Sequence, residues 1–244
     1  MGKAVYKFNV RSYECGPNGK LTLPSLCNYL QEAASMHACE LGFSKSDFDA
    51  AGGNISWVLT RMIVKMKRYP GWNDMVSIVT FPRAGRKITA CRDFEIKDAD
   101  GSTLGLASSE WMVINLSTRK ITPVPENVFP CLDPALEPVL GAEPFSPKLK
   151  FPADVPSRAI SFTAQNSHID INGHVNNVHY VEWMLEPSAR GANPSEIEIV
   201  FRSETMAGDE VKVETCDCGG ETFHRAFAPD GKDHAVARTV WNIG

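Results

Sequence analysis

The chain of 244 residues lacks the features of membrane and exported proteins. No apolar run approaches the roughly 18–20 residues that cross a bilayer, and we expect no membrane association. The N-terminal residues contain no apolar signal core, so we expect no targeting segment. Seven cysteines are an odd number and are scattered along the chain, which favours reduced thiols in a cytoplasm over a disulfide framework.

Several kinds of chemistry also lack their usual motifs. No Gly-x-Ser-x-Gly segment is present to supply a serine nucleophile. Cys216 and Cys218 have no second Cys or His pair at zinc spacing, so we expect no metal site. The net charge of −4 excludes a general affinity for nucleic acid. Charged residues make up 22% and hydrophobic residues 43% of the chain, a balance typical of globular proteins.

Positive charge is concentrated in residues 61–97. This segment carries nine cations, Arg61, Lys65, Lys67, Arg68, Arg83, Arg86, Lys87, Arg92 and Lys97, against three acidic residues. Such an excess is usually a solvated face. It is also a candidate docking surface for an acidic partner.

The first half of the chain predicts a strand, a long helix and then further strands. Alternating residues predict a strand at 5–11, and a helix is expected from Pro24 to the Gly42 stop. Residues 54–68, 75–81, 87–98 and 103–116 then have strand composition. Nine of the sixteen prolines lie between residues 122 and 157, which predicts an extended linker laid across a surface.

After the linker the pattern repeats. A shift of 154 residues superimposes Asn18-Gly19 on Asn172-Gly173, and a shift of 135 superimposes Asp74 on Asp209. Each copy therefore predicts a helix wrapped by an antiparallel sheet, with the two copies paired through their sheets. We expect domains at residues 1–121 and 158–244, joined by the linker 122–157.

Only the second copy has a cluster of polar residues at its turn. Asp170, Asn172 and His174 are two residues apart, so in an extended segment their side chains would lie on one side. Asn176-Asn177 then supplies a helix cap. Asp170 could orient or deprotonate a water or simply fix a turn, and His174 suits proton transfer near neutral pH. Glu204 ends a later predicted strand, where its position alone predicts a solvated carboxylate.

These residues belong to segments that match a known family along almost the whole chain. The segments are Arg11-Ser12-Tyr13-Glu14, Leu30-Gln31-Glu32-Ala33-Ala34, Trp57-Val58-Leu59-Thr60-Arg61, Arg68-Tyr69-Pro70, Arg92-Asp93-Phe94 and residues 170–186. With them the chain resembles the acyl-acyl-carrier-protein thioesterases of plants and bacteria. The resemblance implies an α+β tandem hotdog fold, with an acyl-binding first copy and a catalytic second copy.

The resemblance also implies a reaction and its residues. The reaction is hydrolysis of the thioester between a fatty acyl chain and the phosphopantetheine of acyl carrier protein (ACP), without a cofactor of the enzyme's own. The family's catalytic residues fall on Asp170, Asn172, His174 and Glu204, and Thr205 stands where plant members have Cys, which favours attack by water. We expect backbone N–H groups of Val175 and Asn176 to receive the oxyanion. Trp57 and Arg61, in another matching segment, are expected to contact substrate.

Other readings stay open at this level. A hotdog acyl-CoA thioesterase is the nearest alternative, a hotdog dehydratase would draw its acid and base from opposite copies, and a non-catalytic acyl-binding module is the third. Either a monomer or a homodimer is compatible with two copies in one chain. The absence of a transit peptide predicts a bacterial protein, and acyl chain length is not predicted.

Overall fold

The computed structural model of the protein describes residues 2–85, 88–188 and 192–241. Strands of the first half are β1 (Ala4–Asn9), β2 (Ile55–Met66), β3 (Met75–Ala84), β4 (Thr89–Lys97), β5 (Thr103–Asn115) and β6 (Ile121–Thr122). Strands of the second half are β7 (Arg158–Thr163), β8 (Glu196–Phe201), β9 (Glu210–Cys218), β10 (Glu221–Phe227) and β11 (Asp233–Val240). Within the described residues they form one sheet in the order β1-β3-β4-β5-β2-β8-β11-β10-β9-β7, with β6 paired to β5.

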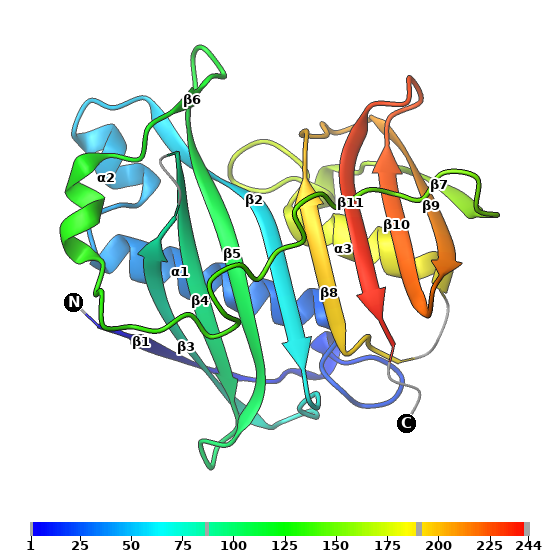
Figure 1. The fold of residues 1–244 in the computed structure, drawn as a ribbon, viewed down its shortest axis with the longest axis horizontal. Helices are drawn as coiled ribbons and strands as arrows, with labels where there is room; N and C mark the ends of the chain where they lie inside the picture. Colours follow the sequence, from blue (N-terminus) through cyan, green and yellow to red (C-terminus); the bar gives the residue numbers. More distant parts are fainter. Residues whose placement is uncertain (1, 86–87, 189–191, 242–244) are drawn as a thin grey trace.

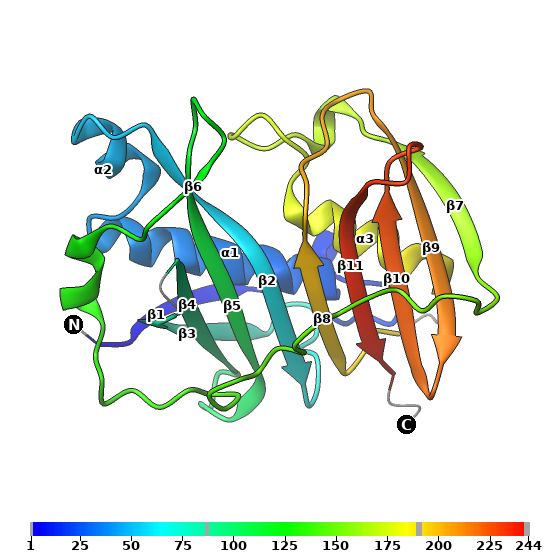
Figure 2. The ribbon, with the colours of Figure 1, turned by 45° about the horizontal axis from the view of Figure 1, so that its top comes forward.

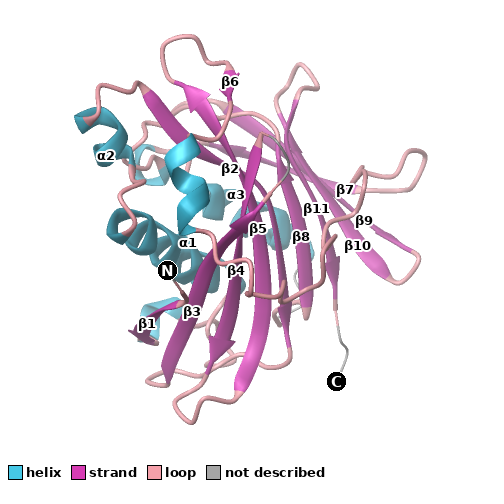
Figure 3. Ribbon diagram, turned by 60° about the vertical axis from the view of Figure 1, so that its left-hand side comes forward, coloured by secondary structure: helices cyan, strands magenta, loops and turns pink. Residues whose placement is uncertain are grey.

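The helices lie on one face of this curved sheet (Figures 1 and 3). They are α1 (Leu23–Glu40), the short α2 (Lys45–Ala50) and α3 (Asn177–Leu185). The long helix of each half lies in the hollow of its own strands, as the repeat predicts (Figure 2). Among the described residues, no helix is long and apolar enough to cross a membrane.

The two long helices begin at equivalent positions because their caps are equivalent. The Thr22 side chain accepts a hydrogen bond from the Ser25 amide, and Asn176 Oδ1 accepts from the Val178 amide at 3.0 Å. Both caps satisfy first-turn N–H groups that have no partner inside the helix. The shift of 154 residues also superimposes β1 on β7, so the internal repeat is a repeat of structure.

β2 and β8 join the two halves. They pair antiparallel, with Arg61 opposite Val200 and Lys65 opposite Glu196, so the sheet continues from one half to the other. Buried residues of both halves belong to a single hydrophobic cluster that includes Leu30 of α1 and Met184 of α3. The expected pairing of the copies through their sheets is therefore confirmed.

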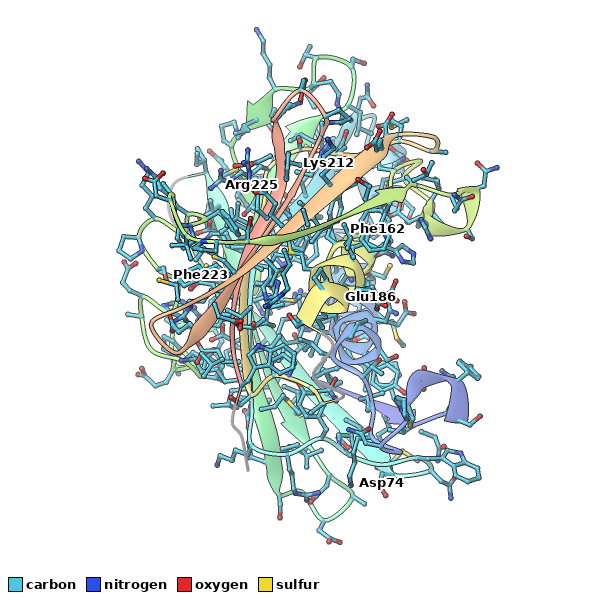
Figure 4. All side chains as sticks on the ribbon, turned by 90° about the vertical axis from the view of Figure 1, so that its right-hand side faces the viewer. Asp74, Phe162, Glu186, Lys212, Phe223 and Arg225 are labelled. Atoms are coloured by element: carbon cyan, nitrogen blue, oxygen red, sulfur yellow. The ribbon has the colours of Figure 1, made fainter. Side chains whose placement is uncertain are left out.

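The second half packs its helix against the inner face of β7, β9 and β10. The Phe162 ring stacks on Trp183 of α3 with centroids 5.6 Å apart, and Figure 4 places Phe162 beside this helix. Residues of β10 alternate between buried and half-buried. Phe223 and Arg225 are on its outer face, away from α3 (Figure 4). This alternation is what a sheet covered by helices on one side requires.

Some regular structure lies where none was expected. α2 begins at a capping box in which Ser44 and Asp47 bond each other's backbone, and this motif marks the start of a helix in the sequence. A 3-10 segment, Glu126–Cys131, lies inside the stretch expected to be linker, and β6 spans the start of that stretch. Val124 and Val128 of this stretch pack with Phe43 and Phe48 of the first half.

Beyond these elements the linker crosses the face of the sheet that the helices leave open (Figures 1 and 2). Glu198 of β8 anchors it from beneath. Its carboxylate accepts from the Ser146 amide at 2.8 Å and the Ser146 hydroxyl at 2.6 Å, and from Arg61 Nη2 at 3.1 Å. The side chain of Glu198 is only 1% exposed, so these donors replace its water.

We predict that Glu198→Ala lowers the free energy of unfolding by about 3 kcal/mol, because Arg61 and the Ser146 amide lose a buried charged partner. Urea unfolding measures the change. Glu210→Ala, at an exposed strand-end position, is the control and should change stability by less than about 0.5 kcal/mol. Equal losses in the two variants would contradict a clamping role for Glu198.

Candidate active site

Residues 170–174 form a tight turn, so the extended arrangement considered from the sequence is wrong. Asp170 N–H donates to the His174 carbonyl at 2.9 Å, and the Gly173 amide donates to the Asp170 carbonyl at 3.0 Å. An antiparallel bridge pairs Ile169 with Val175 on either side. Gly173 has φ of 83°, a left-handed conformation that glycine adopts without steric cost.

The first half contains the same turn with Gly16 and Lys20 in place of Asp170 and His174. Gly16 N–H donates to the Lys20 carbonyl at 2.9 Å, Cys15 bridges Leu21, and Gly19 has φ of 71°. Each of these contacts is the counterpart of one in 170–174 at a shift of 154 residues. The turn therefore belongs to the fold, whereas the side chains of Asp170 and His174 are particular to the second half.

Asp170 fixes this turn. One carboxylate oxygen accepts from the Asn172 amide at 2.8 Å, and the other accepts from Asn172 Nδ2 at 3.3 Å. Both of its oxygens are thus engaged with Asn172, an exposed residue whose side chain is held over the turn. The structure gives Asp170 the turn-fixing role, and through it an orienting role on Asn172.

His174 and Glu204 form the second pair of the site. His174 Nε2 lies 3.2 Å from Glu204 Oε2, and both side chains are partly exposed. The same oxygen of Glu204 also receives the guanidinium of Arg119. No described residue bonds the other oxygen, Oε1. All four predicted catalytic residues line one cavity, as two side-chain pairs.

The prediction that the Val175 and Asn176 amides receive the oxyanion is wrong, because both already bond carbonyl oxygens. The Val175 amide donates to the Thr205 carbonyl at 2.9 Å, and the Asn176 amide donates to the His168 carbonyl at 2.9 Å. Both bonds fix the entry to α3. Of this segment, Asn177 has the N–H group that bonds no described residue, because it is the first residue of the helix. Asn177 lines the cavity, so an anion there would meet the positive end of the α3 dipole.

The segment that carries Glu204 is fixed on both sides. Ser203 Oγ lies 2.9 Å from Nδ1 of the buried His234 and 3.0 Å from the Asp233 carbonyl. Thr205 Oγ1 accepts from the Tyr180 hydroxyl at 2.7 Å. Burial of His234 lowers its pKa, and burial raises the pKa of Tyr180 to about 12, so both side chains stay neutral near pH 7.

A cavity of about 2140 Å³ extends from these residues into the first half. Its lining there combines polar residues with a group of apolar side chains, Trp57, Leu59, Met112, Ile114, Val124 and Val128. The indole of Trp57 donates to the Phe43 carbonyl at 2.9 Å and packs near Phe48. Trp57 thus lines the cavity, and its contact with substrate stays a prediction.

Arg61 is placed differently from expectation. Its guanidinium bonds Glu198 and the Ser146 carbonyl and lies over the Phe145 ring, so it holds the linker on the outer face. The reason is that the buried carboxylate of Glu198, on the neighbouring strand β8, needs a cationic partner. Arg61 is also among the residues that line the cavity, so a contact of Arg61 with substrate stays a prediction.

The positive charge of residues 61–97 is mostly neutralised within the chain. Lys65 pairs with Glu196, Arg68 with Asp98, Arg83 with Asp93, and Lys97 with Glu95. Arg92 is buried, and Arg86 and Lys87 lie outside the described residues. These pairings weaken the case for a basic docking face in this segment.

Arg92 forms a polar contact in the wall of the cavity. Its Nη1 lies 2.9 Å from Nδ1 of His37 and 3.3 Å from Thr80 Oγ1. A guanidinium can only donate, so Nδ1 of His37 accepts and the ring is neutral. Burial and the neighbouring Arg92 lower the pKa of His37 to about 4, and burial lowers the pKa of Arg92 to about 10.

The depressed pKa of His37 predicts acid sensitivity. The unfolded chain takes up this proton near pH 6.5 but the folded protein only near pH 4, so the stabilisation is complete above pH 6.5 and is lost as the pH falls toward 4. The loss is at most about 3 kcal/mol. In unfolding measured from pH 7 to 4, His37→Gln should show a shallower decline than the wild type. Parallel curves for His37→Gln and wild type would exclude this cause.

Solved structures of other proteins share the fold of this chain. The bacterial acyl-ACP thioesterase from Bacteroides thetaiotaomicron superimposes with a TM-score of 0.82 at 25% identity, over 98% of this chain and 97% of that one. The 12:0-ACP thioesterase from Umbellularia californica gives 0.86 at 24% identity, covers 98% and 97% of the two chains, and shows the shared fold alone. The fold is thus the expected α+β tandem hotdog.

Sequence comparison narrows the class to a family. The acyl-ACP thioesterase N-terminal domain matches residues 3–132, and the acyl-ACP thioesterase C-terminal domain matches residues 154–243. The chain belongs to the acyl-ACP thioesterase family. It is 30% identical to the chloroplastic palmitoyl-acyl carrier protein thioesterase of Arabidopsis thaliana and 31% identical to the oleoyl-acyl carrier protein thioesterase of Coriandrum sativum, covering 96% and 83% of this chain. It spans 63% and 57% of those two relatives.

Proposed function

We propose that this protein hydrolyses the thioester of fatty acyl-ACP, releasing the free fatty acid and the carrier protein. The observation that carries the proposal is the His174–Glu204 pair at a cavity that runs into the apolar interior of the first half. Membership of the family supports the same reaction. The first half binds the acyl chain and the second half holds the catalytic groups.

Glu204 acts as the general base in this scheme. Its Oε2 is held by His174 and Arg119, which leaves Oε1 to accept a proton from water. Asp170 is less suited, because both of its oxygens already accept from Asn172. The hydroxide equivalent attacks the thioester carbon, and the proton taken by Glu204 passes through His174 to the departing phosphopantetheine sulfur.

The oxyanion of the tetrahedral intermediate lies at the N-terminus of α3. The Asn177 amide is the donor available there, and the helix dipole favours the negative charge. Asn172, held by Asp170, orients the attacking water. Thr205 bonds Tyr180 and Val175 through its hydroxyl and carbonyl, so it supports the position of Glu204.

The reaction needs no metal or cofactor of the enzyme. ACP brings the phosphopantetheine, and we propose ACP rather than nucleic acid or a membrane as the partner. The seven cysteines are free thiols, which suits a reducing compartment, and we place the protein in a cytoplasm.

Release of free thiol from acyl-ACP substrates of eight to eighteen carbons tests the proposal. We expect turnover by the wild type and a loss of about 100–10,000-fold in kcat for Glu204→Gln, the range typical of a lost general base. Glu210→Gln is the matched control and should retain wild-type activity. Acyl-CoA esters assayed alongside separate a carrier-protein thioesterase from a CoA thioesterase. Tight acyl binding without turnover would instead identify a binding module.

A second variant tests where the acyl chain lies. Ala90 lines the cavity and, like Trp57, packs against the buried cluster that contains Phe43, so Ala90→Phe should shorten the cavity and lower kcat/KM for the longest accepted chain by about 10-fold or more. Shorter chains should be hydrolysed as by the wild type, and Ala99→Phe in an exposed turn should leave the profile unchanged. An equal loss at every chain length would place the chain elsewhere.

A further inference from the structure

Arg119 reaches the candidate active site from the other half of the protein. It lies at the tip of the hairpin between β5 and β6, which stands beside the loop leading into α3 (Figure 2). Its guanidinium Nη2 contacts Glu204 Oε2, 85 residues further along the chain. Arg119 was not among the residues expected from the sequence.

The hairpin tip is rigidly built. Asn115 Oδ1 accepts from the amides of Ser117 at 3.1 Å and Thr118 at 2.8 Å. The Arg119 amide donates to the Asn115 carbonyl at 2.8 Å, and the Asn115 amide donates to the Lys120 carbonyl at 2.9 Å. Every residue of the tip is thereby fixed relative to the end of β5, which defines where the Arg119 side chain begins.

The backbone of Arg119 is in a conformation that favours glycine. Its φ is 56°, in the left-handed region that costs an L-residue about 1 kcal/mol or more. Glycine would fill this turn position at lower cost. The stability of the hairpin therefore does not account for an arginine here, whereas a task of its side chain does.

The ion pair with Glu204 adds little to stability. The two side chains are 46% and 36% exposed, and pairs so exposed contribute at most about 1 kcal/mol. The contact instead sets the orientation of the Glu204 carboxylate. Arg119 and His174 both hold Oε2 of Glu204, a residue that lines the cavity, and no described residue bonds Oε1.

We propose that Arg119 is a positioning residue for the general base Glu204, which rests on the hydrolysis proposed above. The first half thus contributes to the catalytic geometry as well as to chain binding. Without Arg119 the carboxylate is held by His174 alone and samples orientations that do not meet the water.

The test is steady-state hydrolysis of acyl-ACP by Arg119→Met, Arg119→Lys and the double variant Arg119→Met/Glu204→Gln. We expect Arg119→Met to lower kcat by about 10–100-fold with KM changed less than about 3-fold, since misplacement of a catalytic group by 1 Å costs up to about 100-fold. Arg119→Lys should recover part of the loss, and added guanidinium chloride at low concentration should raise kcat of Arg119→Met. In the Glu204→Gln background, Arg119→Met should cause no further loss, because the base that it positions is gone.

Lys120→Met, one residue away in the same hairpin, is the control and should match the wild type. Unfolding curves of all variants identify any loss of fold, which the exposure of Arg119 makes small. An increase in KM alone would make Arg119 a substrate-binding residue and overturn the proposal, as would multiplicative losses in the double variant or wild-type kcat in Arg119→Met. If the wild type shows no turnover, the proposed function itself is overturned. If the wild type is active and Arg119→Met is equally active, only the role of Arg119 is overturned.

Discussion

The pairing of β2 with β8 is the interaction on which the rest of this structure depends. It turns two half-sheets into one, so both long helices lie on the same face and share one hydrophobic cluster. It also brings the hairpin after β5 close to the end of β8, because β5 is the neighbour of β2. Arg119 can meet Glu204 only in this arrangement. The buried Glu198 and Arg61 at the junction, covered by the linker, add a polar contact that favours this register over others.

The repeat in the sequence predicted the fold closely because its landmarks are turns and caps. Asn18-Gly19 and Asn172-Gly173 mark turns with the same hydrogen bonds, and Thr22 and Asn176 cap helices that begin 154 residues apart. Such signals are local and survive when the surrounding residues change. α2 was missed because its capping box stands before only six helical residues. The structured start of the linker was missed because proline content says nothing of the pocket that Val124 and Val128 fill.

The sequence predicted which residues form the candidate site, but it did not predict how they are arranged. The spacing of Asp170, Asn172 and His174 singled them out, yet alternation along a strand was the wrong rule for a turn closed by glycine. The Val175 amide bonds the Thr205 carbonyl and the Asn176 amide bonds the His168 carbonyl, and no local sequence pattern reveals these partners. The sequence suggested a substrate contact for Arg61 and no role for Arg119. Arg61 faces the linker, whereas Arg119 contacts a catalytic candidate through a pairing of segments 85 residues apart.

The edges of the fused sheet have a consequence for association. Two separate half-sheets would have four edges, each with unpaired N–H and C=O groups that can recruit a strand from another chain. Joining β2 to β8 removes two of them. Among the described residues the remaining edges are β1 and β7, the first strand of each half and only six residues long, and the two-residue β6. Short edge strands are poor templates for adding a further strand. The protein therefore gains, within one chain, protection against the edge-to-edge aggregation to which open sheets are prone.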